Sequence, residues 1–156
     1  MIKIKTPVWS IISSCFDGYC KAYIYLWISK KWQIIYVGQT NDKRGSIGRA
    51  FSHIQDEGTL RQRFEEEVGV RLEQADDLIL VSYPLPQEPK YFGIETSYRE
   101  AIEYLVQIGL RDIRGDVEPT FQVISNIRCN DRTSSPFIRK YATEIVRNFQ
   151  ANYSAY

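Results

Sequence analysis

Five side chains that can act together on a phosphodiester are spread along the sequence: Tyr25, Tyr36, Arg49, His53 and Glu103. An arginine can hold a phosphate, and a single carboxylate can hold a hard divalent cation that keeps several of its waters. A tyrosine or a histidine can move a proton. These residue types favour metal-assisted phosphodiester chemistry, and the alternative is a set of unrelated core and surface positions.

The spacing of the five residues supports the first interpretation. Arg49 and His53, the only histidine of the chain, stand four apart on one predicted helix and therefore share a face. Tyr25 and Tyr36 lie on two strands joined by a tight turn, which can bring them close at the open end of the hairpin. Glu103 lies among apolar residues of a later helix, where a carboxylate partly faces the core.

Apolar periodicity predicts the elements that position these residues. Strands are expected over 22–29, 32–38 and 77–83, with a short one near 121–125, and helices over 47–54, 60–68, 97–108 and 136–150. The fold class is α/β (α+β), with a small, mostly antiparallel central sheet that starts with a β-hairpin and is flanked by helices.

Local signals set the expected boundaries of these elements. Thr59, the Ser97–Glu100 capping box and Ser135 are predicted helix starts, and Gly109 is a predicted helix end. Lys30 and Lys31 form the expected hairpin turn, segment 41–46 and the proline-rich segment 84–93 are expected to be loops, and most of 111–135 is expected to be irregular.

Length and composition predict one soluble globular domain. The chain has 156 residues, 44% hydrophobic and 25% charged, and no apolar run long enough to span a membrane. No long apolar segment follows the lysines near its start, and its three cysteines are expected to be free thiols, so we expect a cytoplasmic protein. The predicted core covers about 22–126, between an extension over 1–21 and a basic helical extension over 127–156.

The charge distribution points to a nucleic acid more than the net charge of +1 does. Basic residues gather in 30–49 and 121–150, and acidic residues in 56–77. This pattern predicts a basic face beside an acidic back. Within the last predicted helix, Arg139, Lys140 and Arg147 are candidates for contacts to duplex DNA.

Four segments together resemble the GIY-YIG nuclease superfamily: Tyr23-Ile24-Tyr25, Tyr36 to Asp42, Arg49 to His53, and Ala101 to Val106. The resemblance covers residues 22 to about 122. It implies a stand-alone endonuclease of the restriction or defence type that cuts duplex or branched DNA with Mg²⁺ or Mn²⁺. With one active site, cutting both strands needs a homodimer or two successive encounters.

The resemblance also implies roles for individual residues. Arg49 would bind the phosphate, His53 would occupy the position of a histidine or tyrosine, and Glu103 would be the sole metal ligand. An activated water would attack the phosphorus in line, with Tyr25 or Tyr36 as general base. Lys43 or Arg44 would lower the pKa of that tyrosine, which is ~10 when free.

Three departures from the family pattern keep other functions open. Tyr23 replaces the first glycine of the signature, and the loop before Arg49 is longer. Gln122 stands where the family has an asparagine, and Asn126 is a substitute. A catalytically silent nucleic-acid-binding module that retains the fold is therefore the main alternative. A structural or protein-interaction domain is a third possible function.

Overall fold

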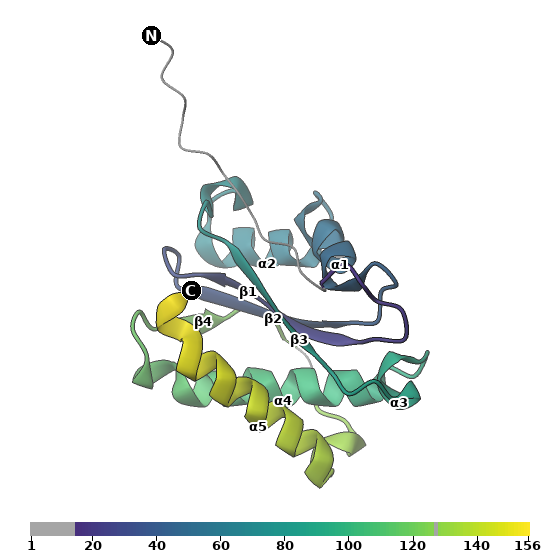
Figure 1. The fold of residues 1–156 in the computed structure, drawn as a ribbon. Helices are drawn as coiled ribbons and strands as arrows, with labels where there is room; N and C mark the ends of the chain where they lie inside the picture. Colours follow the sequence, from purple (N-terminus) through teal and green to yellow (C-terminus); the bar gives the residue numbers. More distant parts are fainter. Residues whose placement is uncertain (1–14, 127) are drawn as a thin grey trace.

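The computed structural model describes residues 15–126 and 128–156, with a four-stranded sheet at the centre (Figure 1). The strand order is β3-β1-β2-β4, with β1 at Tyr23–Ser29, β2 at Ile34–Thr40, β3 at Ile79–Pro84 and β4 at Gln122–Val123. Strand β1 pairs antiparallel with both β2 and β3, whereas β4 runs parallel to β2. The class and the opening hairpin are confirmed, and the sheet is mixed.

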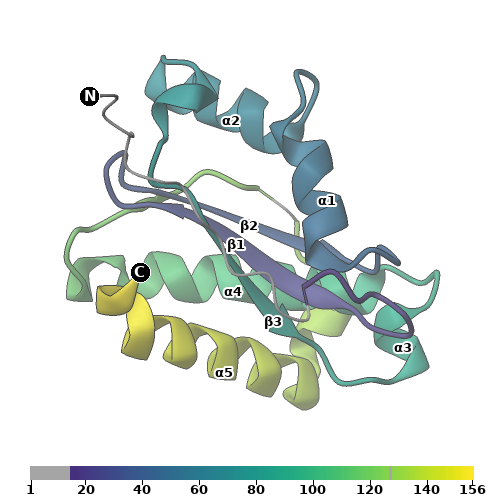
Figure 2. The ribbon, with the colours of Figure 1, turned by 45° about the horizontal axis from the view of Figure 1, so that its top comes forward.

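Helices cover both faces of this sheet (Figure 2). One face carries α1 and α2, at Gly45–Ile54 and Thr59–Val68, and the other carries α4 and α5, at Ser97–Ile113 and Pro136–Asn152. A four-residue helix, α3, spans Pro89–Phe92. Four short 3₁₀ turns complete the elements, at Leu72–Gln74, Arg114–Asp116, Asp131–Ser134 and Tyr153–Ala155.

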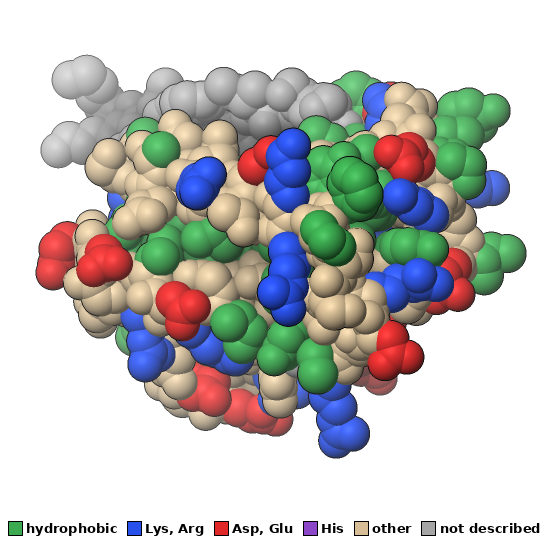
Figure 3. Space-filling view, turned by 90° about the horizontal axis from the view of Figure 1, so that it is seen from below, with side chains coloured by type: hydrophobic (Ala, Val, Ile, Leu, Met, Phe, Trp, Pro, Cys, Tyr) green, Lys and Arg blue, Asp and Glu red, His purple; other side chains and the backbone are tan. Residues whose placement is uncertain are grey.

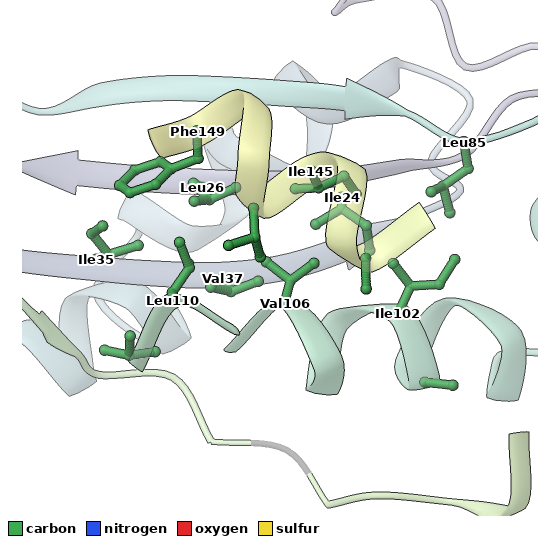
Figure 4. Packing of buried hydrophobic residues seen from close by; sticks show 14 of the residues in the cluster. Ile24, Leu26, Ile35, Val37, Leu85, Ile102, Val106, Leu110, Ile145 and Phe149 are labelled. Carbon is green, nitrogen blue, oxygen red and sulfur yellow. The ribbon is translucent and has the colours of Figure 1, made fainter. Parts of the chain in front are cut away.

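Both faces of the central hairpin are buried, which explains why its strands are nearly continuous apolar runs. Ile24, Leu26 and Val37 point toward α4 and α5, where they join the larger core (Figure 4). Tyr25 and Tyr36 point the other way, into a smaller core that α2 completes. Burial of each large apolar side chain contributes about 1.5–3 kcal/mol. The two tyrosines are thus fixed by the same packing that builds the sheet.

Helix α4 continues past Gly109, where the sequence predicted its end, and stops only at Ile113. The reason lies in α5. A Cβ atom at Gly109 would approach Val146 Cγ2 to 2.7 Å, so this glycine allows the two helices to pack closely. Gly109 is a contact residue and not a C-cap.

Three other local predictions were wrong. The N-cap residues of α2 and α4 are Gly58 and Thr96, one position before the predicted ones, and neither makes a side-chain cap. Ser97 instead accepts a hydrogen bond from Arg132 Nε at 2.7 Å. The hairpin turn spans 30–33 rather than two residues.

The predicted loops were partly wrong. Segment 84–93 contains α3, with a proline in its first turn. Helix α1 begins at Gly45, inside the predicted 41–46 loop. Across residues 15–126 and 128–156, no helix has the length and apolar character needed to cross a bilayer.

Candidate active site

The register of the hairpin places the two tyrosines diagonally on one face of the sheet. Tyr25 lies opposite Gly38, and Tyr36 lies opposite Trp27. A Cβ atom at Gly38 would come within 2.3 Å of the Tyr25 ring carbon Cζ and of its hydroxyl oxygen. The Tyr25 ring therefore crosses directly over Gly38, and only a glycine leaves room for it.

The Gly38→Ala variant is expected to lose about 1–3 kcal/mol of stability, because the new methyl group overlaps the Tyr25 ring. Urea unfolding measures this change. In a Tyr25→Ala background the same substitution should cost much less, since the ring is absent. Gly115→Ala is the control, because a Cβ atom there has nothing within 4 Å. An equal loss at Gly38 with and without the ring would contradict the packing argument.

His53 lies buried between the two tyrosines. Its Nε2 atom is hydrogen-bonded to the Tyr25 hydroxyl, and its ring contacts the Tyr36 ring edge-on at 5.2 Å between centroids. The Leu60 backbone N–H donates to His53 Nδ1 at 3.4 Å. Burial, with help from the Arg49 charge, lowers the pKa of His53 to about 4. The imidazole is therefore neutral at pH 7, and with Nδ1 accepting, its proton sits on Nε2 and points at the Tyr25 oxygen.

Arg49 supplies positive charge to both tyrosines from the exposed edge of α1. Burial raises the pKa of Tyr25 well above its usual range, and Arg49 opposes this shift by its charge and by a hydrogen bond. Burial also raises the pKa of Tyr36 to about 12, again against the charge of Arg49. The Nε2 atom of His53 and the charge of Arg49 thus both act on the Tyr25 hydroxyl.

Glu103 completes the group from α4, on the other side of the sheet. Its side chain is 9% exposed, and burial, followed by the charge of Glu100, raises the pKa of Glu103 to about 8. Arg49 acts in the opposite direction. The negative charge of Glu103 in turn raises the pKa of Tyr25 and of Tyr36. Glu103 therefore interacts electrostatically with Tyr25, Tyr36 and Arg49, and His53 with Arg49 and the two tyrosines.

The surroundings of Glu103 fit a hydrated divalent cation. In the described part of the chain, no group of three or more His, Cys, Asp or Glu side chains could hold a metal by itself. A single carboxylate suits Mg²⁺, which keeps several waters. One turn after Glu103, Gln107 is fully buried, and neither polar atom of its side chain has a hydrogen-bond partner. Gln107 lies on the same face of α4 as Glu103, so its amide is a further polar group on that face.

The predicted supporting residues do not all lie beside the two tyrosines. These residues are Lys43, Arg44, Gln122 and Asn126. Lys43 is exposed, and Arg44 forms an ion pair with Asp42 at 3.0 Å. Gln122 pairs with Ile34 at the far end of β2 and donates to Glu67 on α2 at 3.3 Å.

Asn126 lies nearer to the tyrosines. Val37 N–H donates to Ser125 Oγ at 2.9 Å, so the chain still follows β2 beyond β4. Continuing the parallel register puts Asn126 opposite Gly38. Of the two amides proposed for the family asparagine, Asn126 is therefore the one beside the site.

The predicted DNA-binding residues lie elsewhere. Arg139, Lys140 and Arg147 are exposed on α5, across the sheet from the two tyrosines. Figure 3 shows the face over α4 and α5, where basic, acidic and hydrophobic side chains are interspersed. The basic residues of α1 and those of α5 therefore lie on opposite sides of the sheet, whereas Lys30 in the hairpin turn lies over the ring of Tyr153, just after α5.

The polar residues that follow Gly38 hold the end of β2 in place. Gln39 Oε1 accepts from Arg99 Nε at 2.7 Å, and Arg99 also donates to the carbonyls of Tyr91, Gly93 and Glu95. Asn41 donates to the carbonyls of Phe92 and Gly93 at 3.1 Å. Arg99 is 2% exposed, so this network fixes α4 relative to β2 from inside the protein.

The Arg99→Ala variant is expected to lose about 2–4 kcal/mol of stability, because Gln39 and three backbone carbonyls lose a buried charged donor. Arg147→Ala, which removes an exposed arginine, should change stability by less than about 0.5 kcal/mol. Thermal and urea unfolding of both variants test this. Similar small losses at the two positions would show that the Arg99 network is not structural.

Two site residues on α2 escaped the sequence analysis. Thr59 hydrogen-bonds to Tyr36, and the charge of Arg63 lowers the pKa of Tyr36. The two stand one helical turn apart, which was the signal available in the sequence, but only the packing of α2 on the sheet shows which residues they face.

Comparisons of the chain with models of protein families, with curated proteins and with solved structures find no match.

Proposed function

We propose that the chain is a metal-dependent endonuclease that hydrolyses phosphodiester bonds of DNA, as its resemblance to GIY-YIG nucleases implies. The main support is that Tyr25, Tyr36, Arg49, His53 and Glu103, from four separate elements, meet in one group. A structural cluster has no need for a buried carboxyl without a cationic partner. A group that binds a cation and a phosphate does need one.

Each residue of the group has a distinct role in this proposal. Arg49 binds the scissile phosphate from the exposed edge of the site. Tyr25, as the tyrosinate, accepts the proton of the attacking water; the charge of Arg49 and the Nε2–H of His53 favour this anion against the burial that disfavours it. Glu103 would hold Mg²⁺ or Mn²⁺, which would supply electrostatic stabilisation of the phosphoryl oxygens. Tyr36 orients the His53 ring.

The test is cleavage of plasmid and oligonucleotide substrates with Mg²⁺ and with Mn²⁺, comparing the wild type with Glu103→Ala. Cleavage that needs the metal and disappears in the variant is the expected result. Persistent cleavage by the variant would mean a contaminant or a misplaced site. No cleavage of duplex, single-stranded or branched DNA by the wild type would refute the proposal.

A silent nucleic-acid-binding module is the second candidate, and the position of Gln122 favours it. The amide that replaces the family asparagine is bound to Glu67, at the far end of β2 from Gly38. Such a module would shift DNA in a gel with Mg²⁺ present and leave it intact. A protein-interaction domain would show no salt-dependent DNA binding at all.

A homodimer is the arrangement we propose for cutting both strands of a duplex, because each chain carries one such site. Double-strand cleavage should then accelerate with protein concentration at fixed DNA. First-order cleavage that does not depend on protein concentration would count against the dimer.

A further inference from the structure

The outer edge of the site, on α2, carries an arginine that the proposed chemistry does not use. Leu60 and Phe64 bury this helix against the two tyrosines. On the helix surface, Thr59 and Arg63 stand one turn apart and immediately before those two anchors, so they share one side. The backbone N–H of Leu60 donates to His53 Nδ1 at 3.4 Å, so the first turn of α2 lies beside the site.

Arg63 differs from the neighbouring arginines, because it forms no ion pair with a residue in 15–126 or 128–156. Arg61 is bound to Glu65 at 3.3 Å and to Glu73 at 2.6 Å, and Arg71 is paired with Glu73 at 3.4 Å. Arg63 takes part in no hydrogen bond or ion pair with any residue that the structure describes, and its side chain is exposed. An unpaired guanidinium at the rim of a site is free to bind an anion bidentately.

The arrangement offers two separate cationic positions. Arg49 on α1 acts on both Tyr25 and Tyr36, and Arg63 on α2 acts on Tyr36. The two tyrosines are diagonal neighbours in an antiparallel pair, where separations are about 7–8 Å. Helices α1 and α2, which carry the two arginines, contact each other beside these tyrosines, so one backbone that crosses the site can meet both arginines.

We infer that Arg63 binds the phosphate adjacent to the scissile one. The inference rests on the proposed function for the identity of the ligand and adds the substrate class to it. A substrate that uses both arginines carries a phosphate on each side of a nucleotide. The site therefore selects an internal position in a polynucleotide over a mononucleotide or a terminal phosphate. Arg63 is a substrate-binding residue here and takes no part in moving protons.

The first test measures binding without cleavage. Fluorescence anisotropy of a 20-base-pair duplex in EDTA, over a range of KCl concentrations, compares the wild type with Arg63→Gln and with Arg71→Gln as the matched control. Arg63→Gln should weaken binding about 5- to 20-fold and reduce the slope of log K against log salt by about one, while Arg71→Gln changes neither. Equal thermal midpoints for the three proteins show that the fold is unchanged.

The second test separates binding from catalysis in the Mg²⁺ cleavage assay. Arg63→Gln should raise KM about 5- to 20-fold with kcat unchanged. A lower kcat with unchanged KM would mean that Arg63 acts through Tyr36, and it would overturn the inference. An unchanged salt slope would overturn it as well.

The two proposals fail separately in these assays. Binding that depends on Arg63, without cleavage by the wild type, would refute the nuclease and keep Arg63 as a phosphate ligand. Cleavage that is unaffected by Arg63→Gln in both KM and kcat would refute the inference and keep the nuclease. A wild type that binds no duplex would refute both.

Discussion

Replacing Glu103 with Gln should reduce metal-dependent cleavage by a factor of about 10³ or more, while the protein stays folded. Glutamine has nearly the same shape as glutamate and keeps the packing of α4, but it carries no charge that could hold Mg²⁺ or Mn²⁺. Single-turnover cleavage of an oligonucleotide measures the effect. Glu100→Gln, one turn earlier on α4 and outside the proposed metal site, is the control and should retain most of the activity.

The same variant should change how stability depends on pH. The pKa of Glu103 is raised to about 8 in the folded protein, from 4.5 in the unfolded chain. Below pH 4.5 the carboxyl is protonated in both states. As the pH rises from 4.5 to 8 the unfolded chain releases its proton first, so the wild type loses stability over this range. The Glu103→Gln variant has no such loss and should be the more stable protein above pH 8.

The loss of stability at low pH should be the same in the wild type and in the Glu103→Gln variant. The pKa of His53 is lowered to about 4 in the folded state, from 6.5 when unfolded. As the pH falls from 6.5 to 4, the unfolded chain takes up a proton first and stability falls. Urea unfolding between pH 4 and 9 measures both limbs. If the Glu103→Gln variant still loses stability as the pH rises from 4.5 to 8, another group causes that loss.

Metal binding provides a readout that needs no cleavage. At pH 8, Mg²⁺ or Mn²⁺ should raise the melting temperature of the wild type, because a ligand that binds only the folded state stabilises it. The Glu103→Gln variant should show no such increase. Equal increases in the two proteins would place the cation away from Glu103.

Tyr25→Phe should lower the cleavage rate by about 10²–10⁴, the range for loss of a general base. The phenyl ring keeps its place over Gly38, and only the hydroxyl that meets His53 and Arg49 is lost. Tyr36→Phe is the matched variant, since it removes a hydroxyl that bonds to Thr59. It should cost about tenfold or less, the effect of a residue that orients its neighbours.

Rates measured between pH 6 and 10 distinguish the two tyrosines further. The wild-type rate should rise with pH as the base loses its proton, and Tyr25→Phe should flatten the rise while Tyr36→Phe retains it. A larger loss in Tyr36→Phe, with a flat profile, would assign the base to Tyr36, whose pKa of about 12 is the lower of the two. Unfolding curves of both variants check that the fold survives.

The elements that carry the chemistry could be predicted from the sequence because their signals are local. The run of aromatic and branched residues in the segment 22–29 predicts a strand, and Pro136 after Ser135 marks the first turn of α5. The hairpin itself was predicted, but its predicted two-residue turn would put Tyr25 directly opposite Tyr36, and the turn over 30–33 makes them diagonal neighbours instead. The helical spacing of Arg49 and His53 likewise puts both near one side of α1.

Other features depended on contacts between distant parts of the chain. Glycine often ends a helix, but the absence of a side chain at Gly109 lets Val146 of α5 pack closely against α4. This packing outweighs the local preference. Ser97 is a good N-cap by composition, but Arg132 engages its hydroxyl. Each competing partner is more than thirty residues away, so no local pattern contains it.

The sequence by itself determined the class of fold, the opening hairpin and the residue types of the site. Only the tertiary structure decided that Gln122 lies at the far end of β2 from Gly38 and that Glu103 reaches the tyrosines from the opposite layer. It also decided that Arg61 is paired while Arg63 has no ion pair with a described residue. The physical reason is that side-chain identity and periodicity are local properties. Burial, pairing and the pKa values that follow from them are set by neighbours that folding brings from elsewhere.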